Sequence, residues 1–256
     1  MKGLRRATEV LRLLAERPMR PADLAREMGV AWATVYRTVS QLCADGHIVR
    51  DPGSGEYLIG PMTWMLATAY IRDHPVLRVA LPHLESAVTS VNGMLKLCER
   101  IDGSAVTLFA QHNTGAPMIR RYRDQYRVPL HVTAYGYVLL ASQPEHFVDA
   151  YLADPLPAFT PNTVTDPDAV RAHLAEIREQ GYAIVHDDLQ VGIGSIAYPV
   201  LDRDGSVRAA VGCTLLSDSL NSPQQREEHE VLVANLAATI ANSLGWNPLN
   251  MGITAN

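Results

Sequence analysis

The stretch DLAREMGVAWATVYRTVSQLCADGHIVRD, residues 23–51, sets the fold class of the N-terminal part of this 256-residue chain. Its apolar residues follow a helical period on both sides of Gly29, which predicts two helices joined by a tight turn. In the second helix Val35, Val39 and Leu42 fall on one face, and small or polar side chains with one arginine fall on the other. Such a face suits the major groove of DNA, so the stretch predicts a DNA-binding helix-turn-helix.

The candidate DNA contacts lie on the polar face and edge of the second helix and on the strand after it. We expect Arg37 to contact a base or a phosphate, because arginine can donate two parallel hydrogen bonds. Alternatively, Arg37 is a solvated helix residue and Arg50 a charge at a strand edge. The predicted contacts are Ala33, Thr34, Tyr36, Arg37, Ser40, Gln41 and Arg50.

Further elements are predicted on both sides of this pair of helices. Apolar residues within 10–14 predict a first helix that Pro18 ends, and the segment HIVRDPGSGEYLIG, 47–60, predicts two strands around a Pro-Gly-Ser-Gly turn. Three helices followed by a β-hairpin make a winged helix-turn-helix domain, which we assign to residues 1–60.

Charge is distributed unevenly along the chain. Residues 1–60 hold nine Lys and Arg against seven Asp and Glu, whereas the remainder holds thirteen against twenty. A basic front end on an acidic body predicts that the front end meets a polyanion. The sequence shows no signal peptide and no run of 18 apolar residues, and its three cysteines are scattered, so we expect a cytoplasmic protein with free thiols.

Residues 61–74 are predicted as a linker and residues 75–256 as a second domain. The helix expected over 61–73 is apolar almost all round, which favours burial in a dimer interface; the alternative is a core helix of the second domain. Beyond it, helices and strands alternate as in an α+β domain. Its last helix is expected to begin at Ser222, with Gln225 closing a capping box.

Residues 23–51 resemble the DNA-binding domain of the isocitrate-lyase-regulator (IclR) family of bacterial transcription factors, most specifically in the segment TVYR, 34–37. Trp32 departs from the family's usual lysine or other polar residue, and it contacts a sugar or packs on the neighbouring helix. Residues 128–142, 177–211 and the last helix resemble the family's GAF-like α/β effector domain. The resemblance implies a ligand-responsive regulator of a catabolic operon, a repressor or an activator, that binds double-stranded operator DNA as a dimer of dimers.

In the resembling family a small molecule lies between the sheet and the segment equivalent to 133–136. The backbone N–H groups that begin a helix there are predicted to be free, and a helix N-terminus favours a carboxylate. The resemblance carries over positions on the facing strands, to which we add apolar candidates. The predicted pocket comprises Ala134, Tyr135, Gly136, Ser195, Gly212 and Thr214, with Met94, Leu97, Met118 and Tyr122.

Three positions bear on the size of the effector. Gly212 is expected to open space, and Tyr135 and Tyr137 are expected to offer rings that can stack, which favours a small aromatic carboxylate or a derivative of one. The alternatives are a short keto or hydroxy acid, and a Tyr135 that merely packs in the core. An arginine cluster either neutralises the effector's carboxylate or is solvated and paired with neighbours. The cluster is Arg120, Arg121, Arg123 and Arg127.

The sequence predicts no catalytic residue, no metal ligand and no cofactor. Ser195, His186 and Asp188 can be imagined as a triad, but the segment GIGSIA, 192–197, is not a nucleophile elbow. The histidines lie on separate segments without metal-binding spacing. A small hydrolase or metal enzyme, and a protein-interaction module that binds no DNA, are the alternatives from other classes.

Overall fold

The computed structural model describes residues 3–113 and 126–246, and the chain forms two compact units, Met1–His74 and Pro75–Asn256. Within the described residues, no helix is both long enough and apolar enough to cross a membrane.

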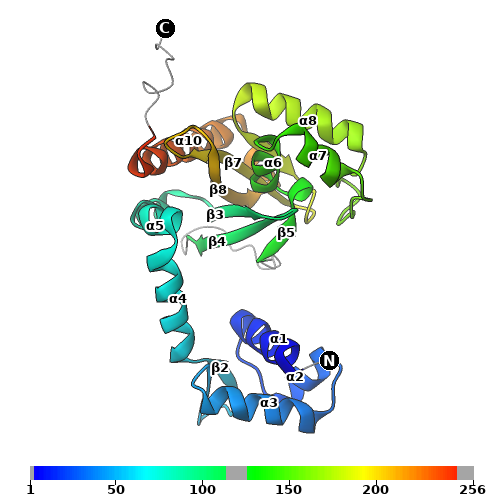
Figure 1. Ribbon diagram of the computed structural model, residues 1–256, viewed down its shortest axis with the longest axis vertical. Helices are drawn as coiled ribbons and strands as arrows, with labels where there is room; N and C mark the ends of the chain where they lie inside the picture. The colour runs from blue at the N-terminus through cyan, green and yellow to red at the C-terminus, as the bar shows by residue number, and fades with distance from the viewer. Residues whose placement is uncertain (1–2, 114–125, 247–256) are drawn as a thin grey trace. The chain divides into compact units, whose positions relative to one another are not determined.

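Three helices of the first unit pack around a small apolar core (Figure 1). Val10, Leu24 and Val39 are completely buried in it. Gly29 follows the second helix with a φ of 63°, a left-handed conformation that glycine adopts without steric cost, so the chain turns directly into the third helix. The predicted winged helix-turn-helix is confirmed. Its elements are α1 (Gly3–Glu16), α2 (Pro21–Met28), α3 (Trp32–Ala44), β1 (Ile48–Arg50) and β2 (Tyr57–Ile59), followed by α4 (Pro61–Asp73).

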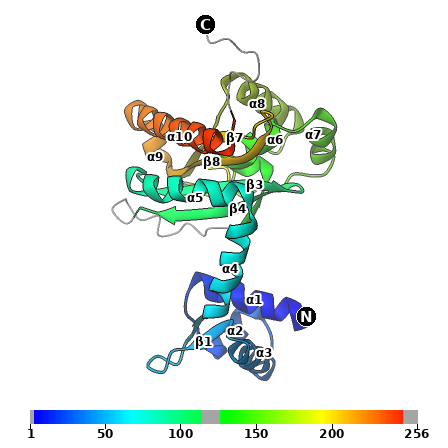
Figure 2. The same cartoon turned by 60° about the vertical axis from the view of Figure 1, so that its left-hand side comes forward.

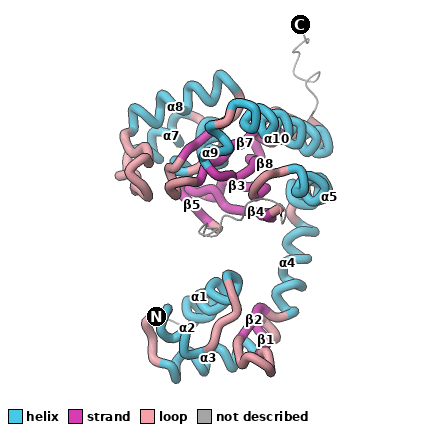
Figure 3. Tube along the Cα trace, turned by 180° about the vertical axis from the view of Figure 1, so that it is seen from behind, coloured by secondary structure: helices cyan, strands magenta, loops and turns pink. Residues whose placement is uncertain are grey.

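The wing is an antiparallel hairpin that is tied to the chain between α1 and α2 (Figure 3). Tyr57 and Met19 exchange two backbone hydrogen bonds of 2.8 and 3.2 Å. At the tip, the N–H of Ser54 donates to the Asp51 carboxylate at 2.7 Å. The carbonyl of Ser54 accepts from the Arg20 guanidinium at 3.0 Å, so the tip is held beside the start of α2.

Helix α4 buries none of its side chains within the chain. Trp64 is 72% exposed, and Met65, Leu66 and Tyr70 are about half exposed. Most large apolar side chains of a folded protein are covered, so this helix presents an unusual surface.

The second unit is built on a six-stranded sheet in which every neighbouring pair is antiparallel (Figure 2). The strand order is β5-β4-β3-β8-β7-β6. The strands are β3 (Met94–Ile101), β4 (Ser104–His112), β5 (Arg127–Pro129), β6 (Ala183–His186), β7 (Ile193–Leu201) and β8 (Val207–Leu216). The α-helices are α5 (Pro75–Ala87), α6 (Ala134–Ala141), α7 (Glu145–Leu152), α8 (Pro167–Gln180), α9 (Ser217–Asn221) and α10 (Pro223–Leu244).

Helices α6 and α10 cover opposite faces of this sheet. On the α6 face the strand register aligns Lys96, Gly212 and Ala197 across three neighbouring strands. Leu97 and Val211 are also paired, but they point to the α10 face, because successive side chains of a strand alternate between faces. Neighbouring residues of β3 therefore face two different layers of the core, one on the α6 side and one on the α10 side.

The start of α10 differs from its prediction. Ser222 does occupy the N-cap position, but its side chain makes no cap hydrogen bond. In a capping box the third helical residue accepts the N–H of the N-cap, and the N–H of Ser222 already donates to the Asp218 carbonyl at 3.3 Å. The preceding short helix α9 thus takes the place of the predicted capping box.

Candidate functional site

The residues predicted to contact DNA lie together on the outer face of α3 and on the wing. Six of the seven are exposed, whereas Thr34 is half-buried. The amide of Gln41 donates to the Asp45 carboxylate at 3.2 Å, so it is partly occupied within its own helix. Arg37 is exposed near the middle of this face and is well placed for a contact outside the chain.

The arginines of the first unit fall into two groups by their ion pairs. Arg12 pairs with Glu9 at 2.8 Å, Arg26 with Asp23 at 2.7 Å and Arg17 with Glu27 at 2.5 Å. Among the described residues, five others have no carboxylate partner, of which Arg5 and Arg6 lie on α1. The remaining three lie at the start of α2, on the outer face of α3 and on the wing; they are Arg20, Arg37 and Arg50. Uncompensated guanidinium groups on one face favour binding of a polyanion.

Trp32 stacks on Tyr36, one helical turn later in the same helix. The ring centroids are 5.0 Å apart with the planes inclined by 22°. Trp32 remains 54% exposed, so it does not belong to the core. The pair borders a groove of about 530 Å³ whose other lining residues include Arg20 and Arg50 but no acidic side chain.

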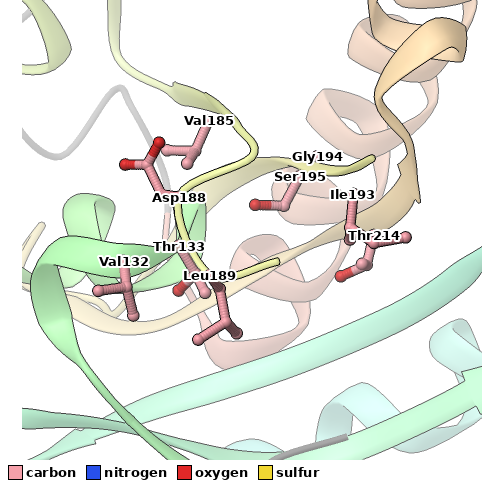
Figure 4. Close-up of a pocket in the computed structure, with 9 residues that line it drawn as sticks. All are labelled: Val132, Thr133, Val185, Asp188, Leu189, Ile193, Gly194, Ser195 and Thr214. Carbon is pink, nitrogen blue, oxygen red and sulfur yellow. The ribbon is translucent and has the colours of Figure 1, made fainter. Parts of the chain in front are cut away.

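A small cavity in the second unit lies where the N-terminus of α6 meets β7 and β8 (Figure 4). Its volume is about 20 Å³, enough for a molecule the size of water. The lining combines three hydroxyl groups, one carboxylate and apolar side chains. The lining residues are Val132, Thr133, Val185, Asp188, Leu189, Ile193, Gly194, Ser195 and Thr214.

Hydroxyl groups already cap the N-terminus of α6. The N–H of Ala134 donates to Ser195 Oγ at 3.1 Å, and the N–H of Gly136 donates to Thr133 Oγ1 at 3.2 Å. The prediction that these two N–H groups are free is therefore wrong. A carboxylate at this helix end must either displace the hydroxyls or accept hydrogen bonds from them.

Two predicted pocket residues line the cavity and others lie beside it. Ser195 and Thr214 are lining residues, and the Tyr135 hydroxyl lies 3.2 Å from Thr214 Oγ1. Met94 is paired with Thr214 in the register, which puts it on the same face of the sheet. Met118, like Tyr122, lies outside the described residues.

Leu97 and Gly212 do not have the roles that the sequence predicts. Leu97 is fully buried on the α10 face, away from the cavity, because it lies an odd number of residues from Met94 on one strand. A side chain at Gly212 would lie 2.0 Å from the Ile196 carbonyl oxygen. The missing side chain therefore lets the backbone of β7 approach and opens no space for a ligand.

Of the arginine cluster, Arg127 is described and the other three members lie outside the described residues. The guanidinium of Arg127 lies 3.4 Å from the exposed Asp102 carboxylate, and about half of its side chain is in solvent. This geometry agrees with the solvated alternative for Arg127.

Three residues at this site, Asp188, Thr133 and Lys96, were not among the predicted effector contacts. Asp188 and Thr133 line the cavity, and Lys96 is only 4% exposed, with its ammonium 6.0 Å from the centroid of the Tyr135 ring. Burial and the nearby Asp187 raise the pKa of Asp188 to about 7. Tyr137 is fully buried, and its hydroxyl has no hydrogen-bond partner in the described structure. The three consecutive titratable residues His186, Asp187 and Asp188 could have indicated Asp188 as a site residue. Nothing in the sequence around Lys96 indicates that this lysine is buried, because lysines are mostly exposed.

The imagined triad is not assembled among the described residues. Ser195 Oγ accepts a backbone N–H, and no hydrogen bond joins it to His186. Nor do the described residues contain a group of three potential metal ligands.

Comparison with known proteins identifies the family. The description "Bacterial transcriptional regulator IclR C-terminal" matches residues 68–242, and the description "IclR helix-turn-helix domain" matches residues 3–52. The chain belongs to the IclR family. It is therefore a DNA-binding transcriptional regulator, and the effector domain of the IclR family implies a small-molecule ligand.

Two curated proteins and one solved structure are similar to this chain over most of its length. The glycerol operon regulatory protein of Streptomyces coelicolor is 31% identical and covers 96% of this chain and 97% of that protein. The transcriptional repressor AllR of Klebsiella pneumoniae is 28% identical over 89% of this chain and 83% of that protein. A solved IclR homologue from Microbacterium hydrocarbonoxydans, complexed with 4-hydroxybenzoate, has a TM-score of 0.73 and 26% identity and covers 95% of this chain and 99% of that chain.

Proposed function

We propose that this IclR-family regulator controls a catabolic operon and responds to a small carboxylic acid, in the first place an aromatic one. The observation that carries this proposal is the cavity at the N-terminus of α6, where hydroxyl groups of Thr133, Ser195 and Thr214 converge. Hydroxyl donors at the positive end of a helix favour a carboxylate.

Two further residues support an aromatic anion. Lys96 is buried on the same sheet face as Thr214 and brings a positive charge close to the site. Tyr135 offers a ring next to that lysine and holds Thr214 through its hydroxyl. The complex of a solved relative with 4-hydroxybenzoate agrees with an acid of this kind.

The size of the cavity favours a second candidate effector, a short keto or hydroxy acid. A volume of about 20 Å³ admits no aromatic ring, so an aromatic acid enters only if the lining residues move apart. A two- or three-carbon acid needs a smaller displacement. The name of the Streptomyces relative, which refers to a glycerol operon, agrees with small aliphatic chemistry.

We also propose that α4 pairs with a second copy of the chain, in a dimer that assembles into a dimer of dimers on a near-palindromic operator. The exposed apolar side chains on α4, from Trp64 to Tyr70, support this because a helix of this composition is stable in water when another surface covers it. Effector binding then acts by favouring one arrangement of the winged domains over another.

A thermal-shift screen of the full chain tests the effector class. Benzoates and phenylpropionates are compared with pyruvate, glyoxylate and lactate, since a ligand at one hundred times its Kd adds about 2.7 kcal/mol of stability. Ser195→Ala should lose the shift, whereas Arg127→Ala, an exposed ion-paired residue, should keep it. Shifts from short acids alone would favour the second candidate, and no shift from any acid would contradict both.

A further inference from the structure

Asp188 differs from its neighbour Asp187 in how its carboxylate is satisfied. The Asp187 carboxylate accepts from the N–H of Gly192 at 2.7 Å and from Ser217 Oγ at 2.6 Å, so it holds the loop together. Asp188 is 7% exposed, and its carboxylate has no hydrogen-bond partner in the part of the chain that is described. The loop therefore anchors one acid and leaves the other facing the cavity.

A second unsatisfied group lies close to Asp188. The Tyr137 hydroxyl is buried without a hydrogen-bond partner among the described residues, and the negative charge of Asp188 raises its pKa further than burial alone. Buried polar groups are nearly always hydrogen-bonded, and exceptions often mark a functional site. Tyr137 does not line the cavity, so within its lining the group that is left for a polar ligand is the Asp188 carboxylate.

The hydroxyl groups of the cavity can donate hydrogen bonds to a ligand, whereas the Asp188 carboxylate can accept one. Ser195 Oγ and Thr133 Oγ1 each accept a backbone N–H of α6, which leaves their own protons for an acceptor on a ligand. Asp188, when ionised, can only accept. Figure 4 shows the Asp188 carboxylate beside Val185 and apart from the Ser195 hydroxyl, so the donors and the acceptor occupy different parts of the lining.

We propose that Asp188 is a specificity-determining residue that accepts a hydrogen bond from a hydroxyl group of the effector, so that the effector is a hydroxylated carboxylic acid. This inference rests on the proposed function, because it assigns the carboxylate end of the same ligand to Ser195 and Thr133. An acid without the hydroxyl buries the Asp188 carboxylate unpaired, and an ether at that position brings an acceptor against an acceptor.

Calorimetric titration of the full chain at pH 8 tests the inference with ligands that differ in one group. The first set is benzoate, the three monohydroxybenzoates and their methyl ethers; the second is propionate and lactate. We expect at least one hydroxylated acid to bind tenfold or more tightly than its parent acid and its methyl ether. Equal affinity of parent and hydroxylated acids would overturn the inference and leave the carboxylate proposal standing. Failure of every acid to bind would overturn both.

A variant separates recognition of the hydroxyl from a structural role of Asp188. Asp188→Leu should reverse the preference, so that the parent acid binds more tightly than the hydroxylated one, which a loss of folded protein cannot produce. Asp149→Asn, an exposed acid on α7 that pairs with Arg171, should keep the wild-type preference. An Asp188→Leu variant that binds with unchanged preference would overturn the inference; should it fail to fold, the comparison of ligands on the wild-type chain stands alone.

Discussion

The DNA-binding face and the effector cavity use polar side chains in opposite ways. On α3 and the wing the arginines are exposed and uncompensated, and the predicted contacts come from one helix and one adjacent strand. In the cavity the hydroxyls are buried, and the hydrogen bonds that organise them join residues 61 and 79 positions apart. A polyanion can be attracted by surface charge, whereas a small molecule needs groups that the whole domain brings together.

The largest expected effect is a loss of stability, and it tests whether Leu97 lies on the sheet face opposite the cavity. Leu97→Ala should reduce the free energy of unfolding by about 2–5 kcal/mol, because the residue is fully buried on the α10 face. Denaturant unfolding measures this change, and effector affinity per folded molecule should stay the same. Met94→Ala, on the half-buried cavity side, is the matched variant and should cost less stability but alter effector affinity. The reverse pattern would show that the two layers are assigned wrongly.

On the DNA-binding face, Arg37→Ala should weaken operator binding tenfold or more, because a base-reading arginine contributes roughly 1–3 kcal/mol of discrimination. A gel-shift series with operator and unrelated DNA measures both affinity and specificity. Arg12→Ala is the control, since Arg12 is exposed but already paired with Glu9. Equal losses in the two variants would mean that the free guanidinium of Arg37 has no special role.

The buried acid of the cavity should make stability depend on pH. The folded-state pKa of Asp188 is raised to about 7, above its ordinary value near 4, so its favourable neutral form is lost as the pH rises through 7. Asp188→Asn should therefore raise the free energy of unfolding by roughly 1–2 kcal/mol at pH 8 relative to wild type, and by much less at pH 4. Unfolding curves at the two pH values, without effector, measure the difference. An equal gain in the free energy of unfolding at both pH values would show that ionisation of Asp188 is not its cause.

The smallest expected effect concerns the stacked aromatic pair. Trp32→Ala should change the free energy of unfolding by less than about 0.5 kcal/mol, because the side chain is more than half exposed. If the pair borders bound DNA, operator affinity should nevertheless fall at least twofold, with Trp32→Phe keeping most of it. Unchanged affinity in both variants would limit the DNA-binding face to the arginines and the polar residues of α3.

Sequence reasoning succeeded or failed at particular positions for identifiable reasons. The helix-turn-helix follows from apolar spacing and from Gly29, whose left-handed φ ends α2 as predicted. Leu97 was assigned to the pocket from its apolar character, although its odd spacing from Met94 on one strand places the two on opposite faces. Gly212 was interpreted as open space, and only the position of the β7 backbone shows that the space is filled.

The amino-acid sequence was sufficient for the features that depend on near neighbours: the winged helix-turn-helix, the polar face of α3, the basic front end and the family. Three- and four-residue spacing places side chains on one face of a helix whatever the rest of the chain does. The cavity arose from the folded domain, because the segment before α6, which carries Thr133, meets the β6–β7 hairpin, which carries Asp188 and Ser195, through sheet register and helix packing. Burial then sets the chemistry of the cavity, since a carboxylate such as that of Asp188, with little access to water and no hydrogen-bond partner among the described residues, is a group that a ligand can satisfy.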